Sequence, residues 1–198
     1  DSKPLRSVVP GEFEMYWVKN LTGIEIIEQR AIAAIDRIVF IDSIGEAYPV
    51  TDYDYYGSSD KAVRLKDVIT SLPQETVSDN VFIAASDGLE KNEKSGTFLS
   101  AYLKITGDDS PAFLSEDIPK GMWVKSIYYF LFGNSAYFSV KNGFNLLTVS
   151  NIENKDCIKL NDIFKVCGIS GNSKYFFKAT DDYSIEVDSA SIEKGYVY

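Results

Sequence analysis

The sequence contains no histidine and only two cysteines among its 198 residues. Without histidine the chain cannot form a Ser-His-Asp or Cys-His relay, or a histidine-ligated zinc, iron or copper site. The single pair of cysteines, Cys157 and Cys167, is too few for a disulfide scaffold. Long apolar runs are also missing, because the longest, residues 127–132, has the length of a strand. A membrane span needs about 18 apolar residues, so we expect no membrane insertion.

Positive charge is scarce, since the chain has 20 lysines and arginines against 29 aspartates and glutamates, which gives a net charge of −9. A surface this acidic repels phosphate backbones and anionic headgroups, so we expect no nucleic-acid partner. Aromatic residues are abundant, with 13 tyrosines and 12 phenylalanines. Such a composition is typical of β-structure and of adhesive binding faces.

Two segments of the chain repeat the same helical pattern. Residues 63–69 read V-R-L-K-D-V-I and residues 158–164 read I-K-L-N-D-I-F. Their apolar positions follow the spacing of one helix face. These positions are Leu65, Val68, Ile69 and Leu72 in the first copy, and Leu160, Ile163, Phe164 and Cys167 in the second. A continuous apolar run, typical of a buried strand, follows each helix at residues 81–87 and 175–181.

The repeat predicts which side chains fill the core. We expect Leu65 and Leu160 on the helices, and Ile83 and Phe177 on the strands, to be almost fully buried.

A second pair of matches extends the repeat. Residues 17–21 read W-V-K-N-L and residues 123–127 read W-V-K-S-I, and each is expected to form a strand beyond a proline-bearing loop. The order predicts one complete unit, residues 29–130, and a second unit, residues 131–198, that is completed by residues 1–28. This completion can occur within one chain or by segment exchange with a second chain.

The repeated motifs resemble the molybdopterin-binding domain of sulfite-oxidase-type oxidoreductases. That family shows a G-x-P-L-R-L-V-x-P loop followed by a V-K-W or W-V-K strand, and residues 4–11 here read P-L-R-S-V-V-P-G. Its G-V-x-L-x-D-L-L helix is similar to residues 63–69, and its D-G-Y turn is similar to residues 87–89 and 181–183. The resemblance implies a β-rich α+β fold with two repeated sulfite-oxidase-like units and short helices.

The resemblance also implies where a molybdenum cofactor would bind, and there the sequence departs from the family. Family enzymes hold molybdenum through a cysteine on a loop before the helix, but residues 49–57 contain no cysteine. Cys157 is three residues from Leu160, too near to match. A soft metal centre needs a thiolate, so we expect residues 50–57 to carry no molybdenum or pterin. Arg6 matches the arginine of the family's P-L-R loop and is the one candidate cofactor contact.

The segment before the first helix is rich in aspartate and tyrosine. Asp52, Asp54, Gly57 and Asp60 have part of the spacing of an EF-hand, but Val63 stands where the bidentate glutamate belongs. A solvated acidic turn is the alternative. The candidate ligand-binding residues are Asp52, Tyr53, Asp54, Tyr55 and Tyr56. Three phenols within four residues cannot all face one core, so we expect some to be exposed, where they could stack on a sugar, a peptide or a partner protein.

Three interpretations of the cysteines follow from their positions. Cys167 lies on the buried face of the second helix, where it would act as a small apolar core residue. A Cys157–Cys167 disulfide requires Cα atoms within about 7 Å. A reactive nucleophile would lack a histidine to activate it.

The function that these observations favour is a non-catalytic binding or structural module in a larger protein, without a cofactor. We expect an extracytoplasmic or cell-surface location, with the cytoplasm as the alternative. One alternative function is an oxidoreductase subunit that binds molybdopterin. Another is a calcium-dependent, adhesin-like module.

Overall fold

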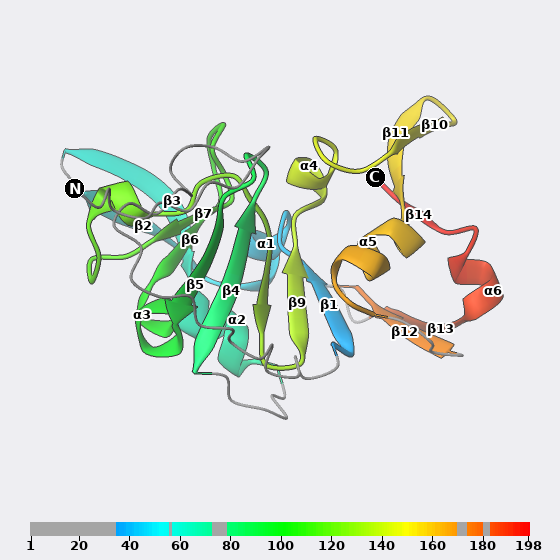
Figure 1. Ribbon diagram of the computed structural model, residues 1–198, viewed down its shortest axis with the longest axis horizontal. Coiled ribbons are helices and arrows are strands. Elements are labelled where there is room, and N and C mark those ends of the chain that lie inside the picture. Colours follow the sequence, from blue (N-terminus) through cyan, green and yellow to red (C-terminus); the bar gives the residue numbers. More distant parts are fainter. Residues whose placement is uncertain (1–34, 56, 73–78, 170–173, 180–182) are drawn as a thin grey trace, which may run out of the picture. The chain divides into compact units, whose positions relative to one another are not determined.

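The computed structural model describes residues 35–55, 57–72, 79–169, 174–179 and 183–198 (Figure 1). All of them belong to one compact unit, residues 33–198. Short strands predominate in these ranges, and the helices have between three and seven residues. The expected β-rich α+β class is therefore confirmed. The N-terminal segment, with Arg6 and the predicted closure of the second unit by residues 1–28, lies outside the described residues.

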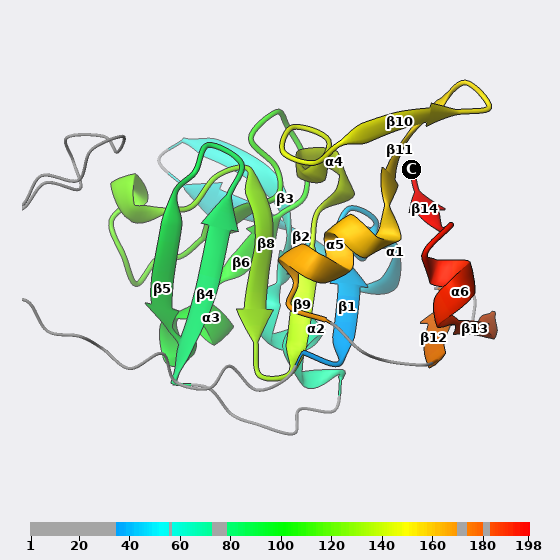
Figure 2. The same cartoon turned by 45° about the vertical axis from the view of Figure 1, so that its right-hand side comes forward.

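A five-stranded sheet forms the centre of this unit (Figure 2). Its strands, in order across the sheet, are β1 (Arg37–Phe40), β9 (Ser135–Phe138), β8 (Ile127–Phe132), β4 (Asn80–Ala85) and β5 (Glu90–Lys94). β1 and β9 run parallel, with Val39 opposite Tyr137, and the other neighbours are antiparallel. The parallel pair joins strands that are about a hundred residues apart in the chain.

Three smaller sheets flank the central one. The first contains β2 (Val50–Tyr55), β3 (Ser58–Arg64), β6 (Tyr102–Lys104) and β7 (Ala112–Leu114). The second contains β10 (Val149–Ile152), β11 (Lys155–Lys159) and β14 (Tyr196–Val197), and the third pairs β12 (Lys174–Lys178) with β13 (Ser184–Asp188). All of these strand pairs are antiparallel.

The helices are short. They are α1 (Ile44–Ala47), α2 (Leu65–Thr70), α3 (Ser95–Ser100), the 3-10 helix η2 (Lys120–Met122), α4 (Val140–Gly143), α5 (Leu160–Val166) and α6 (Ser189–Ile192). Four of them, α2, α3, α5 and α6, begin at the residue after a strand. The predicted helix motifs correspond to α2 and α5. Their first two residues belong instead to β3 and β11.

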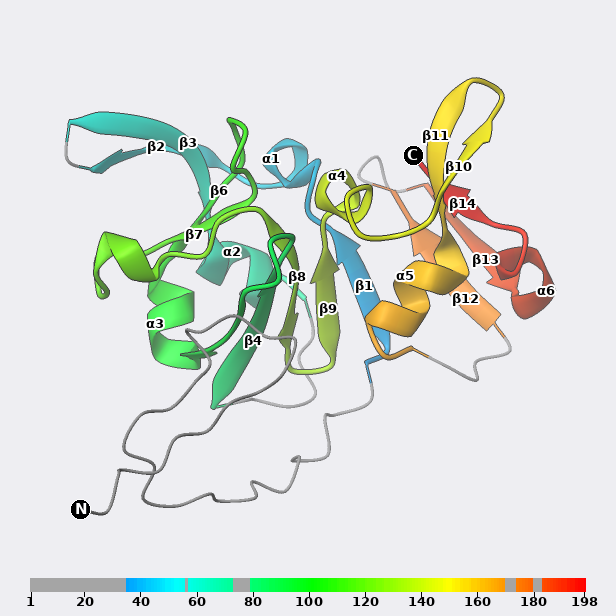
Figure 3. The ribbon, with the colours of Figure 1, turned by 45° about the horizontal axis from the view of Figure 1, so that its top comes forward.

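One order of elements occurs twice along the chain: strand, helix, two strands, helix, two strands, helix, strand. It runs from β1 to β6 and again from β9 to β14. Each time, a hairpin precedes the second helix of the series: β2–β3 before α2, and β10–β11 before α5 (Figure 3).

The two series also share backbone hydrogen bonds at equivalent places. At the start of α2, the Leu65 amide donates to the Ala101 carbonyl over 3.1 Å, and at the start of α5 the Leu160 amide donates to the Gly195 carbonyl over 3.0 Å. The hairpin turns after β4 and β12 match as well. The Ala85 amide donates to the Leu89 carbonyl, and the Ala179 amide donates to the Tyr183 carbonyl, each over 2.8 Å.

Two core clusters lie on opposite faces of the β1–β9 pair. Val39 and Tyr137 belong to the first cluster, which also takes the buried residues of α2 and α3. Ile38 and Phe138, at alternate positions, belong to the second, which takes the buried residues of α5. Since side chains alternate along a strand, β1 and β9 contribute to both cores at once.

A carboxylate fixes the end of this strand pair. Asp42 follows β1 and accepts hydrogen bonds from the Ser139 hydroxyl at 2.9 Å and the Val140 and Lys141 amides at 2.6 and 3.1 Å. These amides belong to the first turn of α4, whose backbone donors need a partner. Asp42 therefore caps a helix that begins about a hundred residues later.

The expected burial is confirmed for three residues and wrong for one. Leu65, Leu160 and Ile83 are buried, but Phe177 is only half-buried. Ile83 lies on β4 between β8 and β5, whereas Phe177 lies on β12, which has β13 as its neighbour within the described ranges.

The expected W-V-K strand at residues 123–125 is also wrong. Residues 123–126 form no strand, and β8 begins at Ile127. Ser126 has a φ of 48°, which lies outside the β region and interrupts the extended chain just before β8.

Truncation of Leu65 to alanine should lower the free energy of unfolding by about 2–5 kcal/mol, because it opens a cavity in the first core cluster. Urea titration followed by circular dichroism measures this change. Met122→Ala is the control, since Met122 is exposed and its truncation should cost less than about 0.5 kcal/mol. Equal costs for the two variants would contradict the assignment of Leu65 to the core.

Candidate functional site

The β2–β3 hairpin carries most of the predicted binding residues. Its register places Tyr53 opposite Asp60, and Asp52 opposite Lys61. Because directly opposed residues point to the same face, Tyr53 and Asp60 share one face of the hairpin, and Asp52 lies on the other. Tyr56 at the tip lies outside the described residues.

Four aromatic side chains, which we call the aromatic cluster, gather on the Tyr53 face. Tyr53 has ring centroids 5.0 Å from Tyr102, 5.9 Å from Tyr55 and 6.1 Å from Trp123. Tyr55 and Trp123 meet edge to face at 5.1 Å. The indole nitrogen of Trp123 donates a 2.8 Å hydrogen bond to the Ser115 carbonyl, which fixes the orientation of the ring. This arrangement buries an aromatic patch beneath a polar hairpin.

The tyrosines of the cluster differ in exposure, as the sequence predicts. Tyr53 is 5% exposed, while Tyr55 and Tyr102 are partly exposed. Burial raises the pKa of Tyr53, and the nearby charges of Glu116 and Asp117 add to the shift. Its hydroxyl has no hydrogen-bond partner among the described residues, so a protonated donor remains inside the cluster.

Cationic side chains lie against the outer rings of the cluster. The Lys120 ammonium lies 4.6 Å from the centre of the Tyr55 ring, and the Arg64 guanidinium lies 5.7 Å from that of Tyr102. The Arg64 Nε also donates to the Tyr102 hydroxyl over 3.0 Å. The outer faces of these two rings therefore already hold cations from the same chain.

A charge network continues from the cluster. The buried Lys104 ammonium lies 3.1 Å from Asp60 and 2.6 Å from Asp109, and Lys125 lies 3.4 Å from the other Asp109 oxygen. Tyr55 donates to Asp60 over 2.6 Å, which raises the pKa of Tyr55. The network links the aromatic cluster to the turn at Asp109.

Lysine pairing changes the acidity of the Asp109 carboxyl. Burial alone would raise the pKa of Asp109, but its hydrogen bond and charge interaction with Lys104, together with Lys125, outweigh burial and lower it. Burial likewise opposes the charge of Lys104, yet the two carboxylates raise the pKa of that ammonium. Both groups are therefore charged at neutral pH, and Asp109 acts as an ion-pair partner rather than as an acid.

The structure does not form the EF-hand-like loop. Asp52 and Asp54 project from one face of the hairpin, and Asp60 projects from the other. Asp52 pairs with Lys61 at 2.7 Å, and Asp60 pairs with Lys104. Because the register separates these carboxylates, they cannot converge on one calcium ion.

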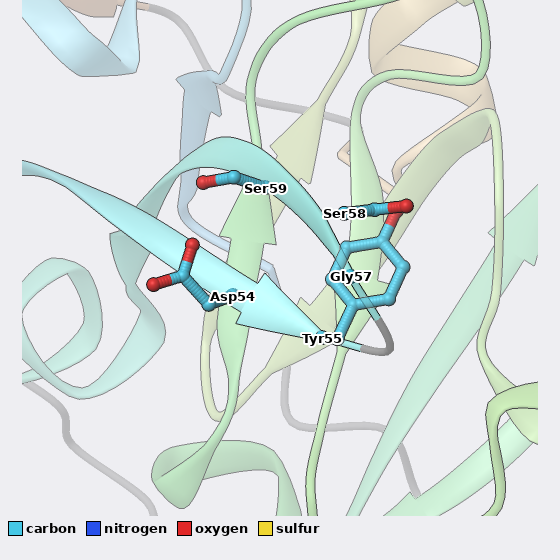
Figure 4. Close-up of a pocket in the computed structure, with 5 residues that line it drawn as sticks. All are labelled: Asp54, Tyr55, Gly57, Ser58 and Ser59. Atoms are coloured by element: carbon cyan, nitrogen blue, oxygen red, sulfur yellow. The ribbon is translucent and has the colours of Figure 1, made fainter.

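A shallow pocket of about 340 Å³ lies at the tip of the hairpin (Figure 4). It is lined by Asp54, Tyr55, Gly57, Ser58 and Ser59. Gly57 has a φ of 77°, which glycine adopts without strain. The lining offers a carboxylate acceptor, two hydroxyls and an aromatic ring, groups that suit a hydroxyl-bearing or peptide ligand. Two predicted binding residues, Asp54 and Tyr55, line this pocket, whereas Tyr53 and Asp52 do not.

The hairpin does not fit a molybdenum cofactor held by a thiolate. Its side chains offer carboxylates, phenols and hydroxyls, which are hard oxygen ligands. Across the described ranges, no three histidine, cysteine, aspartate or glutamate side chains gather as a metal-binding group.

The cysteines are buried thiols in the structure. Cys167 lies in the second core cluster, where burial raises its pKa to about 12. Cys157 lies on β11, and its sulfur contacts the Lys155 carbonyl oxygen at 3.3 Å. The interpretation of Cys167 as a small core residue is confirmed, and the disulfide is not formed.

Comparison with known proteins gives no relative. The sequence matches no family model and no curated protein, and the structure matches no solved structure. Within the described residues, no helix is both long and apolar enough to cross a bilayer.

Sequence reasoning missed part of this site. Tyr102, Lys104 and Trp123 join it through strand pairing and packing over 40 to 70 positions of sequence, and no local motif connects them with the hairpin. Their one available signal was the match of Trp123 with Trp17, which marked a repeat and not a site.

Asp109→Asn should reduce the free energy of unfolding near pH 6 by about 1 kcal/mol, because it removes the carboxylate that pairs with Lys104. Since folding lowers the pKa of Asp109, its stabilisation is present above the ordinary carboxyl pKa and is lost as the pH falls through the folded value. The variant should therefore show a flatter decline of stability between pH 6 and pH 3 in urea titrations.

Asp108→Asn provides the matched control, because Asp108 is an exposed neighbour. It should keep the wild-type dependence of stability on pH. If both variants behave alike, the Lys104–Asp109 pair is not the source of the effect.

Proposed function

We propose that this chain is a non-catalytic binding or structural module, built from two units of a sulfite-oxidase-like, molybdopterin-binding-domain fold. The observation that carries the proposal is the order of nine elements that occurs from β1 to β6 and again from β9 to β14. The equivalent hydrogen bonds at the starts of α2 and α5 support a common origin of the two series. Fold and activity are separable, so the activity must be argued from the site.

The hairpins before the two helices support a loss of cofactor chemistry. β2 and β3 present aspartate, tyrosine and serine where the family carries its metal-ligand cysteine. In the hairpin of the second series, the thiol is Cys157, which is buried and lies three residues before Leu160, where α5 begins. Neither hairpin offers an accessible thiolate to a soft metal.

The hairpin tip supports a binding role in place of catalysis. Tyr55 is held between Trp123 and the Asp60 carboxylate, so its ring is fixed before any ligand arrives. The face of this ring already holds the Lys120 ammonium, but its position beside Asp54 and two serines supports recognition of a hydroxyl-bearing or peptide ligand through these polar groups. We further propose that the module is part of a larger extracytoplasmic or cell-surface protein, with the cytoplasm as the alternative location.

Elemental and pterin analysis of the natively expressed protein tests the absence of a cofactor. We expect molybdenum and pterin far below one equivalent per chain, because no thiolate is placed to hold the metal. Stoichiometric molybdenum or pterin would overturn the non-catalytic assignment and favour an oxidoreductase subunit. Tyr55→Ala should leave this content unchanged.

Calcium should not change the melting temperature, because the hairpin register separates Asp52 and Asp54 from Asp60. Differential scanning calorimetry with millimolar Ca²⁺ and with EDTA measures the effect. An ion that binds only the folded state raises the melting temperature by linkage, so a rise with Ca²⁺ and a fall with EDTA would support the calcium-dependent alternative.

A further inference from the structure

The β2–β3 hairpin leaves one long strand edge open. Within the described ranges, β2 pairs with β3 on one side and with no strand on the other. At the opposite end of the same sheet the edge of β7 is occupied, because the Phe113 amide donates to the Val124 carbonyl over 2.7 Å. An open edge of six residues is a template on which a second chain can add a strand.

A hydrogen bond between β3 and the residue after β6 shows which backbone groups of β2 face this open edge. The Ile105 amide donates to the Lys61 carbonyl over 3.0 Å, so the odd-numbered residues of β3 direct their backbone groups toward β6. The even-numbered residues of β3 direct theirs toward β2, where the register pairs them with residues 51, 53 and 55. The N–H and C=O groups at the open edge therefore belong to Val50, Asp52 and Asp54.

Asp54 is the one carboxylate of the hairpin that has no ion pair among the described residues. Asp52 is paired with Lys61, and Asp60 is paired with Lys104. Asp54 also lines the shallow pocket at the hairpin tip (Figure 4). The last outward-facing position of β2 thus combines backbone groups at an open edge with an unpaired acidic side chain beside a pocket.

The charge of this edge decides which kind of chain can occupy it. Pairing of β2 with the β2 of a second copy would bring the Asp52 and Asp54 side chains of both copies together. Like charges on neighbouring strands destabilise the pair, so the edge disfavours a second copy. The net charge of −9 adds to this repulsion and attracts basic partners instead.

We propose that an extended, basic peptide of a partner protein adds to β2 as a new edge strand, with a lysine or arginine side chain against Asp54. This inference rests on the proposed binding function and names its ligand class. Hydrogen bonds to the outward backbone groups supply affinity for any extended chain, and Asp54 supplies the preference for a basic residue. Ser58 and Ser59 in the pocket offer hydroxyl acceptors to the same basic side chain.

Selection of random phage-displayed peptides on the full chain tests the ligand class. We expect the enriched peptides to carry lysine or arginine among β-forming residues. Synthetic, fluorescently labelled copies of these peptides are the probes for binding measurements by anisotropy. Replacement of their basic residues by glutamate should weaken binding by about tenfold or more.

Charge reversal in the protein tests the position of the basic side chain. Asp54→Lys should weaken binding of the selected peptides by about tenfold or more, because it places a like charge at the open edge. Glu193→Lys is the matched control, since it makes the same change of charge at an exposed residue at the end of α6. The control should bind the peptides as the wild type does. Circular dichroism and urea titration establish that both variants fold.

Amide hydrogen exchange measured by NMR tests the strand geometry. A saturating concentration of a selected peptide should slow exchange at Asp52 and Asp54 by about tenfold or more, because their amides gain acceptors at the edge. The Tyr53 amide faces β3 and should change less. Asp52→Pro should abolish peptide binding, since it removes an outward N–H without removing a bond to β3, and circular dichroism checks that the variant folds.

Four results would overturn the inference. They are a selection that enriches no basic peptides, binding that Asp54→Lys leaves unchanged, equal slowing of exchange at residues 52, 53 and 54, and a dimer of the free chain that Asp52→Pro dissociates. The dimer would show that a second copy occupies the edge. The proposed function fails by a different measurement, the finding of stoichiometric molybdenum or pterin. Selected peptides that bind regardless of Asp54→Lys would reject this edge as the site and leave the binding role standing.

Discussion

The parallel pairing of β1 with β9 is the contact on which the rest of the described structure depends. It joins two series of elements that are far apart in the chain, and it places alternate side chains of both strands in two cores. Asp42 strengthens the junction, because its carboxylate caps α4 directly after β9. Each core is thus completed by a strand that belongs to the other series.

The candidate site depends on the same architecture indirectly, through the sheet that holds the β2–β3 hairpin. The β2–β3 hairpin is held against β6, and the aromatic cluster packs between that sheet and the segment that leads into β8. Lys104 on β6 then ties the hairpin to Asp109 through two ion pairs. Beside the tip of the hairpin, Asp54, Ser58 and Ser59 line the shallow pocket with polar groups.

Local patterns in the sequence predicted the helices α2 and α5, because an apolar spacing of three and four residues fixes one buried face. They failed for residues 123–125, where the backbone at Ser126 leaves the β region, a feature that residue type does not reveal. They also failed for Phe177, whose burial depends on which strands lie beside β12. The aromatic cluster was only partly predictable, since Tyr53 and Tyr55 are local to the hairpin but Tyr102 and Trp123 reach it through pairing at long range.

The shared strands have a consequence for where the chain can be divided. The tight turn at Gly133, between β8 and β9, is the natural boundary of the two series and has a positive φ of 57°. A proteolytic cut at that turn would leave β9 in one fragment and β1 in the other, so neither fragment would hold a complete core. The two fragments should therefore survive only as an associated pair. The two series of elements belong to one compact unit, and not to two domains that could be separated by recombination or circular permutation.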